Sequence, residues 1–371
     1  QEIAIQQAAR PLFFLRMRRL LALLGIGAAF PPLRDDVRVV DLRIYPIKSC
    51  GGISLKSSRM APTGLEMDRV AAVVDGNGRI QTQRLRRRLA AIQPSLDPDT
   101  GIMTLAAEGM PPLQVSLKGP PSEECTPAFA RLGPEGNPMP VWRCPAEVSG
   151  WLTTFLVGAP GLTLQGEDWT ARKGPRGSDN FHLVRFDTEG GFTRRVMDDI
   201  GGDYARPEDQ VAFPDLYPLL MTSTESLQEV NRRVPGPGVP MDRFRPNIVV
   251  SGASKPFDED RWAVVEVGAG DRALTLRCLE NDPRCQVPSI DQKTGEKTPG
   301  FEPVRTLRGF RRLFDPLGKA GILAREGPMF GVYACHGGVS GEICVGDRVE
   351  VVERSEAGSL HEYWAEKAQQ A

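Results

Sequence analysis

The feature that most restricts the fold of this chain is a series of short apolar runs separated by turns that carry glycine or proline. Residues 37–44 alternate in part and stop at Pro46, which is typical of a half-buried strand. Residues 70–74 and 79–83 flank Asp75-Gly76-Asn77-Gly78, the pattern of a hairpin with a glycine-bearing turn. Because further turn signals follow, the first third of the chain is predicted to be a β meander.

The rest of the chain continues this pattern with few helices. Residues 151–157 have aromatic and aliphatic side chains at helical spacing, and residues 223–233 start with Ser and Thr suited to N-capping, so both predict helices. Residues 119–145 are rich in Pro, Gly and Glu without a period and predict a surface loop, while residues 172–177 resemble a linker. Further short β-type runs lie at residues 248–250, 263–267, 274–277 and 347–352. The pattern favours a mainly β fold with some α, arranged as a closed or nearly closed barrel.

Composition excludes several classes of function. The chain has 371 residues, which is long enough for two cores, and its formal charge is -1, so no general attraction to nucleic acid or anionic membrane is expected. Its seven cysteines are an odd number scattered along the chain, which indicates a reducing compartment. With no CxxC pair and only three histidines, the sequence does not predict a structural zinc site.

The N-terminus differs in composition from the rest of the chain. Residues 3–34 hold five arginines and no acid, and residues 20–30 form an uninterrupted run of apolar residues and glycine. This run is shorter than the ~20 residues that a membrane-spanning helix needs. The segment therefore predicts a targeting sequence or a membrane anchor outside the fold, with a disordered extension as the alternative.

The segment with the clearest chemical potential is residues 284–295 (RCQVPSIDQKTG). A cation next to a cysteine favours the thiolate, which is the form that attacks electrophiles or binds soft metals. Cys285 follows Arg284 and lies between two prolines. From the residues alone, a buried structural cysteine or a disulfide with Cys278 explains the pattern equally simply.

Several segments, in order, resemble the MOSC domain, the module shared by molybdenum cofactor sulfurases and amidoxime reducing components. They are residues 242–250 (DRFRPNIVV), 284–295, 330–333 (FGVY) and 345–349 (VGDRV). Upstream, residues 45–52 (YPIKSCGG), Gly64-Leu65 and Asp68-Arg69 resemble the β-barrel domain that precedes MOSC in both groups. The resemblance implies a targeting or anchor segment over residues 1–36, a β-barrel-like MOSC N-terminal domain over 37–170, and a MOSC β-barrel domain over 178–353.

The resemblance also implies a cofactor and the residues that bind it. In the family a pterin dithiolene holds molybdenum, and a protein cysteine completes the sulfur ligation, so Cys285 would be the metal ligand and the catalytic residue. A soft thiolate suits this metal. Positions that match the phosphate- and pterin-binding positions, or that lie beside the ligand, are Lys48, Ser49, Arg69, Ser223, Arg245, Asn247 and Arg284.

Other readings of these positions remain open. Lys48 and Arg69 fit solvated surface charges, and Ser223 fits a simple helix cap. Asp291 fits a turn former better than a supporting acid, and Arg194-Arg195 fit either pterin binding or plain exposure. Many relatives carry a cysteine where this chain has Asp282, so Cys278, which also follows an arginine, is the fallback ligand.

Two groups of enzymes share these motifs. In the sulfurases MOSC follows a large desulfurase domain, for which this chain has no room, whereas residues 302–311 (EPVRTLRGFR) resemble the amidoxime reducing component. The resemblance thus implies a molybdenum-cofactor oxidoreductase that reduces N-hydroxylated substrates such as amidoximes. The alternatives are the MOSC part of a molybdenum cofactor sulfurase, a cofactor carrier or sulfur-transfer protein, and a cofactor-free β-barrel interaction protein.

The electrons for such a reduction have to come from another protein. The chain has no GxGxxG after a strand and only three histidines, so no flavin or haem site is expected. The family implies cytochrome b5 and NADH-cytochrome b5 reductase as donors. It also implies a mitochondrial protein, anchored in the outer membrane through its N-terminus with the catalytic domain facing the cytosol, and no nucleic-acid partner.

Overall fold

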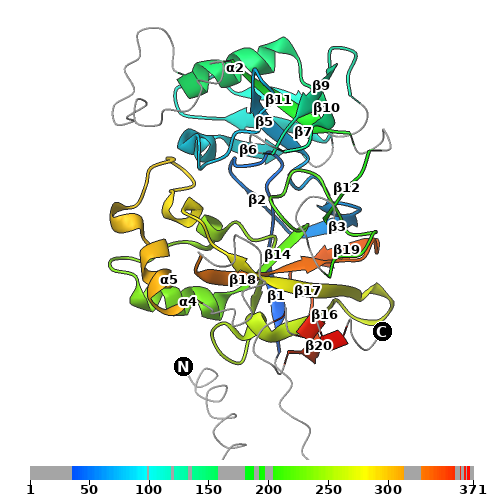
Figure 1. Cartoon of the computed structure of the whole chain (residues 1–371), viewed down its shortest axis with the longest axis vertical. Coiled ribbons are helices and arrows are strands. Elements are labelled where there is room, and N and C mark those ends of the chain that lie inside the picture. The colour runs from blue at the N-terminus through cyan, green and yellow to red at the C-terminus, as the bar shows by residue number, and fades with distance from the viewer. Residues whose placement is uncertain are drawn as a thin grey trace, which may run out of the picture. The chain divides into compact units, whose positions relative to one another are not determined.

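The structure is a computed structural model that describes most of the chain beyond the leader (Figure 1). The described residues are 36–97, 100–117, 121–132, 136–157, 180–187, 192–196, 204–312, 327–355, 360, 363, 364, 366 and 367. The expected leader at 3–34 and the expected linker at 172–177 lie outside them. Among the helices within these ranges, none has the length and apolar character to cross a membrane.

The largest element is an eight-stranded sheet that combines the start of the described chain with its second half. Its order in space is β2 (Ile53–Leu55), β1 (Arg38–Ile44), β15 (Ile248–Ser251), β14 (Leu219–Ser223), β18 (Met329–Cys335), β17 (Leu274–Pro283), β16 (Trp262–Val267) and β20 (Val349–Arg354). The Val39 nitrogen donates to the Asp347 carbonyl, and Val349 donates to Val37, so β1 also bonds to the chain entering β20. The sheet therefore curls back on itself, and the predicted mainly β, barrel-like class is confirmed.

Three smaller sheets and α2 (Ala146–Val157) come mainly from the first half of the chain, with β19 added from near its end. A four-stranded sheet runs β5 (Ala71–Asp75), β11 (Phe181–Phe186), β10 (Met139–Arg143), β9 (Thr126–Ala130). Two three-stranded sheets are β6 (Gln93–Leu96), β7 (Ile102–Ala106), β8 (Leu113–Ser116) and β19 (Gly341–Cys344), β3 (Ser57–Ala61), β4 (Gly64–Leu65). The predicted hairpin forms only in part. Its first arm is β5, and its second arm, residues 79–83, pairs with β5 through a single bridge between Val74 and Ile80.

The prediction of a surface loop over residues 119–145 was wrong. This segment contributes both β9 and β10, and β10 places Met139 and Val141 in the core. The proline and glycine content misled because strand formation depends on cross-strand packing more than on local preference. Here β11, which is distant in the sequence, supplies the pairing partner of β10.

The two predicted helices exist. Residues 151–157 belong to α2, which begins at Ala146, and residues 224–233 form α4 (Thr224–Arg233) with Ser223 as its N-cap. A further helix, α5, spans Val304–Phe310 and contacts α4. Short 3-10 helices are η1 (Arg87–Ala91), η2 (Met241–Phe244), η3 (Asp258–Arg261), η4 (Gly270–Arg272), η5 (Val287–Ser289) and η6 (Pro299–Phe301), and a two-stranded ribbon joins β12 (Arg194–Arg195) to β13 (Gln210–Val211).

A single apolar cluster spans both halves of the described chain. It includes Leu42 and Ile44 of β1, Trp262 of β16, and Leu89 of η1, all fully or almost fully buried. Because the burial of apolar area is the main stabilising term in folding, this shared cluster holds the two halves together. Residues 36–371 accordingly form one compact unit. The expected division between residues 170 and 178 stays a prediction.

Candidate functional site

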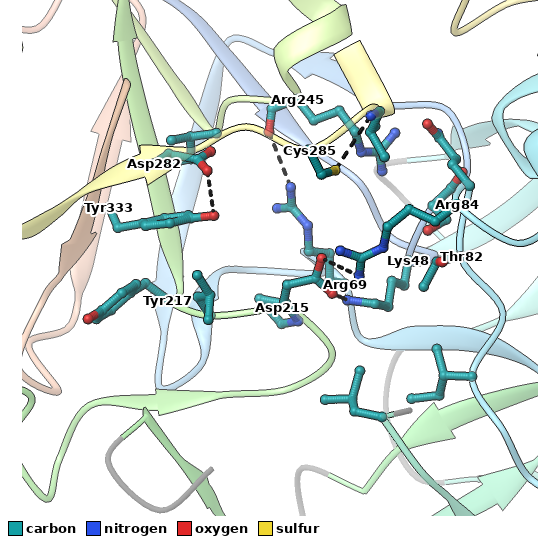
Figure 2. A pocket seen from close by; sticks show the side chains of 18 of the residues that line it. Lys48, Arg69, Thr82, Arg84, Asp215, Tyr217, Arg245, Asp282, Cys285 and Tyr333 are labelled. Atoms are coloured by element: carbon teal, nitrogen blue, oxygen red, sulfur yellow. Dashed lines mark hydrogen bonds and ion pairs between the residues drawn. The ribbon is translucent and has the colours of Figure 1, made fainter. Parts of the chain in front are cut away.

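A cavity of about 1010 Å³ brings together seven of the eight residues that the sequence predicted for the site. They are Lys48, Ser49, Arg69, Arg245, Asn247, Arg284 and Cys285. They come from the loop after β1, the turn before β5, the segment between η2 and β15, and the end of β17. In Figure 2, Lys48 and Arg84 lie on one side of the cavity, Tyr217 and Tyr333 on the other, and Cys285 between them.

Three of these residues hold a backbone conformation that side chains rarely adopt. Ser49 has a φ of 70°, Arg69 of 50° and Arg245 of 56°. A left-handed conformation at a non-glycine residue costs on the order of 1–2 kcal/mol and persists only where the surroundings enforce it. At Arg245 the result is a carbonyl that accepts from Arg69 Nη2 at 3.2 Å while the guanidinium enters the cavity.

Asn247 holds Arg69 in place through hydrogen bonds. Its Oδ1 accepts from the Leu220 nitrogen at 3.1 Å and from Arg69 Nη1 at 3.3 Å, and its Nδ2 donates to the Arg43 carbonyl. Arg69 also pairs with the fully buried carboxylate of Asp68. Asn247 thus fixes Arg69 at the cavity wall with its orientation set.

Lys48, the lysine that lines the cavity, is almost fully buried. Its Nζ donates to the Phe213 carbonyl at 2.6 Å and pairs with Asp215. Burial lowers the pKa of this ammonium to about 8, although the Asp215 carboxylate opposes the change. Asp215 also accepts from Arg84 Nη2 at 3.3 Å. One half-exposed carboxylate therefore links two cations at the cavity edge.

Arg245 is deeply buried, and no carboxylate among the described residues forms an ion pair with it. Arg245 donates through Nη1 to the Cys50 carbonyl and to Gln292, while its Nη2 has no partner among the described residues. Burial lowers the pKa of the Arg245 guanidinium to about 10 and also lowers that of Arg284. The Arg245 guanidinium would therefore gain from an anion in the cavity.

The cavity as a whole carries an excess of positive charge. Its cationic side chains are Lys48, Arg69, Arg79, Arg84, Arg194, Arg245 and Arg284, and its carboxylates are Asp215, Glu280 and Asp282. Seven cations against three acids in a partly buried space favour a multiply charged anion, because buried charges are stable only when paired. A cofactor with a phosphate group meets this requirement, so the residues present fit it.

Cys285 is the cysteine that faces the cavity. It follows directly from the end of β17, is partly exposed, and its Sγ lies 3.5 Å from the Val287 nitrogen. The thiol also interacts electrostatically with Arg84. Cys278 is fully buried inside β17, does not line the cavity, and burial raises the pKa of its thiol to about 12. Accessibility therefore favours Cys285 over Cys278 as a metal ligand. Across the described ranges, no cluster of three or more His, Cys, Asp or Glu side chains is arranged to hold a metal.

The wall of the cavity around Arg284 also contains Asp282, Tyr217 and Tyr333, which were not predicted as site residues. Arg284 pairs with Asp282 and donates to the Phe244 carbonyl at 2.7 Å, and the Tyr333 hydroxyl donates to Asp282 at 2.8 Å. The rings of Tyr217 and Tyr333 lie 5.1 Å apart. Asp282, noted as a departure from the family pattern, thus orients Arg284 and Tyr333.

Ser223 is the one predicted residue that does not line the cavity. It is fully buried, its Oγ accepts from the Ser226 nitrogen as the N-cap of α4, and it donates to Glu259. Asp291 forms a turn by accepting from the backbone of the next residues. Arg194 lines the cavity and donates to two backbone carbonyls, whereas Arg195 is exposed.

Arg84 is the functional candidate that sequence reasoning missed. It lies in the run Arg84-Leu85-Arg86-Arg87-Arg88, where neighbouring charges suggest a solvated surface. Its side chain is 41% exposed and reaches Asp215 and Cys285. The number of arginines in this run was the one feature of the sequence that could have indicated a functional role for Arg84.

Comparison with known families agrees with the two halves of the fold. Residues 36–158 match the family model described as "MOSC N-terminal beta barrel domain", and residues 208–350 match the "MOSC domain". Apart from Arg194, the residues that line the cavity are divided between the two matched segments.

The chain is also similar to characterised proteins along most of its length. It is 31% identical to "Mitochondrial amidoxime reducing component 2" of Rattus norvegicus, over 78% of this chain and 76% of that protein. It is 30% identical to "Mitochondrial amidoxime-reducing component 1" of Homo sapiens, over 80% and 77%. Its identity to "Molybdenum cofactor sulfurase" of Bos taurus is 27%, over 71% of this chain but 28% of that protein.

Proposed function

Since the chain belongs to the MOSC-domain family, with a MOSC N-terminal β-barrel domain, we propose that it is a molybdenum-cofactor oxidoreductase that reduces amidoximes and related N-hydroxylated compounds. The observation that carries the proposal is the cavity in which an accessible cysteine, Cys285, lies beside a surplus of buried cations. The similarity to the amidoxime reducing components over about four fifths of the chain supports the same function.

Each group of cavity residues has a distinct role in this proposal. Lys48, Arg69 and Arg245 hold the phosphate of the cofactor, because ammonium and guanidinium groups donate several charge-assisted hydrogen bonds. Cys285 provides the thiolate that completes the sulfur ligands of molybdenum. Arg284, held by Asp282, keeps a positive charge next to that thiolate. The bound cofactor supplies the redox chemistry, and the protein supplies binding and orientation.

The overall reaction converts an amidoxime, two electrons and two protons into an amidine and water. The N–O bond breaks, the hydroxyl oxygen takes one proton and leaves as water, and the nitrogen gains the other proton. We propose that cytochrome b5 delivers the electrons one at a time after NADH-cytochrome b5 reductase has reduced it, because the chain contains no flavin or haem motif. A mitochondrial location belongs to the same proposal and is supported by the names of the relatives. We further propose attachment to the outer membrane with the catalytic domain facing the cytosol.

The decisive experiment mixes the cofactor-loaded protein with cytochrome b5, its reductase, NADH and benzamidoxime. NADH oxidation should require all three proteins and should match the benzamidine that forms. Cys285→Ser should lose turnover and the molybdenum–thiolate absorption, while the matched variant Cys278→Ser keeps both. If the loaded protein is inactive but transfers a sulfurated cofactor to an apo-hydroxylase, the function is that of a sulfurase. Full turnover in Cys285→Ser would refute the ligand assignment.

A further inference from the structure

Two basic segments meet at the edge of the cavity beside Cys285. One is the arginine run at residues 84–88, and the other is the loop at residues 291–297. They pack so closely that a Cβ added to Gly295 would lie 2.9 Å from the Arg87 carbonyl oxygen. Gln83 and Gln292, at the roots of the two segments, exchange hydrogen bonds of 2.8 and 3.1 Å. The structure therefore joins two charge clusters that are about two hundred residues apart in the sequence.

The joined segments form a surface that we call the basic collar. Its members are Arg84, Arg86, Arg87, Arg88, Lys293 and Lys297. The acids within the two segments are Asp291, which pairs with Arg243, and Glu296. Six cations against these two acids and Asp215, which pairs with Arg84, give a net charge of +3 on the collar, in a chain whose total is -1. This concentration of charge is large enough to steer an acidic macromolecule.

The collar reaches the immediate neighbour of the proposed metal ligand. Lys297 Nζ donates to Gln286 Oε1 at 3.4 Å, and Gln286 follows Cys285 directly. Lys297 also lies 5.1 Å from the centre of the Phe301 ring, which is 53% exposed, and Leu85 is 39% exposed within the arginine run. Exposed apolar side chains among cations resemble a small protein interface more than a site for a free anion.

We propose that the basic collar is the docking surface for an acidic one-electron carrier protein, which delivers electrons beside Cys285. This inference rests on the proposed function, which needs two single electrons from outside for each substrate. An acidic carrier fits because its negative charge complements the positive charge of the collar. Docking there also brings the carrier close to the metal ligand Cys285, which shortens the path for electron transfer. The weak, short-lived complexes of electron transfer need only a small interface and gain most from electrostatic attraction.

The test uses the full cofactor-loaded chain with a soluble cytochrome b5 of net negative charge. The variant Lys293→Glu/Lys297→Glu reverses two exposed collar charges that do not line the cavity. At low ionic strength its KM for the carrier should rise at least about tenfold, and its kcat should stay within about twofold. In 0.5 M salt the difference should largely disappear, because screening shortens the reach of charges.

Arg272→Glu provides the control for a charge change elsewhere. Arg272 is exposed and lies in η4, just before β17, whereas Cys285 follows the other end of that ten-residue strand. A strand of this length spans roughly 33 Å. The control should therefore leave the KM for the carrier unchanged within about twofold.

Two further measurements separate this inference from the proposed function. Reduction of benzamidoxime driven by dithionite bypasses the carrier, so both variants should match the unaltered protein. If the unaltered protein fails here, the proposed function fails, and carrier binding measured by surface plasmon resonance still decides the docking surface. Equal carrier affinity and KM in the collar variant and the unaltered protein would overturn the inference. Loss of binding to anionic lipid vesicles alone would assign the collar to a membrane instead.

Discussion

Replacing Arg245 by Met should cost the cofactor-free protein little stability, whereas the same change at Arg277 should cost much. The two arginines are 8% and 7% exposed, so they are matched in burial. Arg277 pairs with Asp209, whose side chain is fully buried, while Arg245 donates only to the Cys50 carbonyl and to Gln292. The expected difference in stability depends on whether the substitution leaves a buried carboxylate without its cation.

The magnitudes follow from these contacts. Loss of Arg277 leaves the Asp209 carboxylate buried without its cation, which costs about 3–5 kcal/mol. At Arg245, burial lowers the pKa of the guanidinium to about 10, which corresponds to a destabilisation of about 3 kcal/mol. Because the lowered pKa belongs to the folded state, this cost is present at every pH below about 10 and is relieved only above it. Methionine removes it, which offsets the two lost hydrogen bonds of about 1–1.5 kcal/mol each.

The assay is urea unfolding of the cofactor-free proteins at pH 7, followed by tryptophan fluorescence. Arg245→Met should lie within about 1 kcal/mol of the unaltered protein, and Arg277→Met about 3–5 kcal/mol below it. Addition of the cofactor should then stabilise the unaltered protein and Arg277→Met, but Arg245→Met less by about 1.5–3 kcal/mol. An equal loss of stability in both variants would refute the argument and make Arg245 a structural residue.

Two further predictions concern pH and the leader. The cofactor-free protein should bind inorganic phosphate more weakly as pH rises through about 8, because Lys48 loses its charge there. Isothermal titration calorimetry at constant ionic strength should show that Lys48→Arg abolishes this pH dependence. An unchanged pH dependence in Lys48→Arg would contradict the prediction. Deletion of residues 1–34 should release the protein from membranes in cell fractionation without loss of turnover, because the acid-free leader is the predicted anchor. An intact chain found in the soluble fraction would contradict this prediction.

The class of the fold was predictable because its signals are local. Turn residues and short apolar runs gave the positions of β1, β15, β16 and β20 to within one or two residues. The strands β9 and β10 were missed because β9 is stabilised by pairing with β10, and β10 by pairing with β11, more than by their own composition. Local sequence could not indicate that partner.

The candidate site was predictable as a set of residues but not as a geometry. Arg277-Cys278 and Arg284-Cys285 are equivalent pairs in the sequence, and only burial distinguishes a core thiol from one that faces the cavity. Ser223 matched a family position, yet the fold uses it to cap α4 and to bind Glu259. Arg84 escaped notice because only the tertiary fold brings it to Cys285.

Three of the six non-glycine residues that have left-handed backbone conformations in the described chain lie where the proposed cofactor would bind. Ser49, Arg69 and Arg245 hold left-handed backbone conformations, and Arg245 adds a buried, poorly paired charge. Together such features cost several kcal/mol at roughly 1–3 kcal/mol each, a large part of the usual net stability of a folded protein. In a simple barrel an apolar residue in place of Arg245 would avoid the buried charge, whereas Arg69 also neutralises the buried carboxylate of Asp68. Because all three residues line one cavity, an anion that accepts their hydrogen bonds would recover part of this cost at each of them simultaneously.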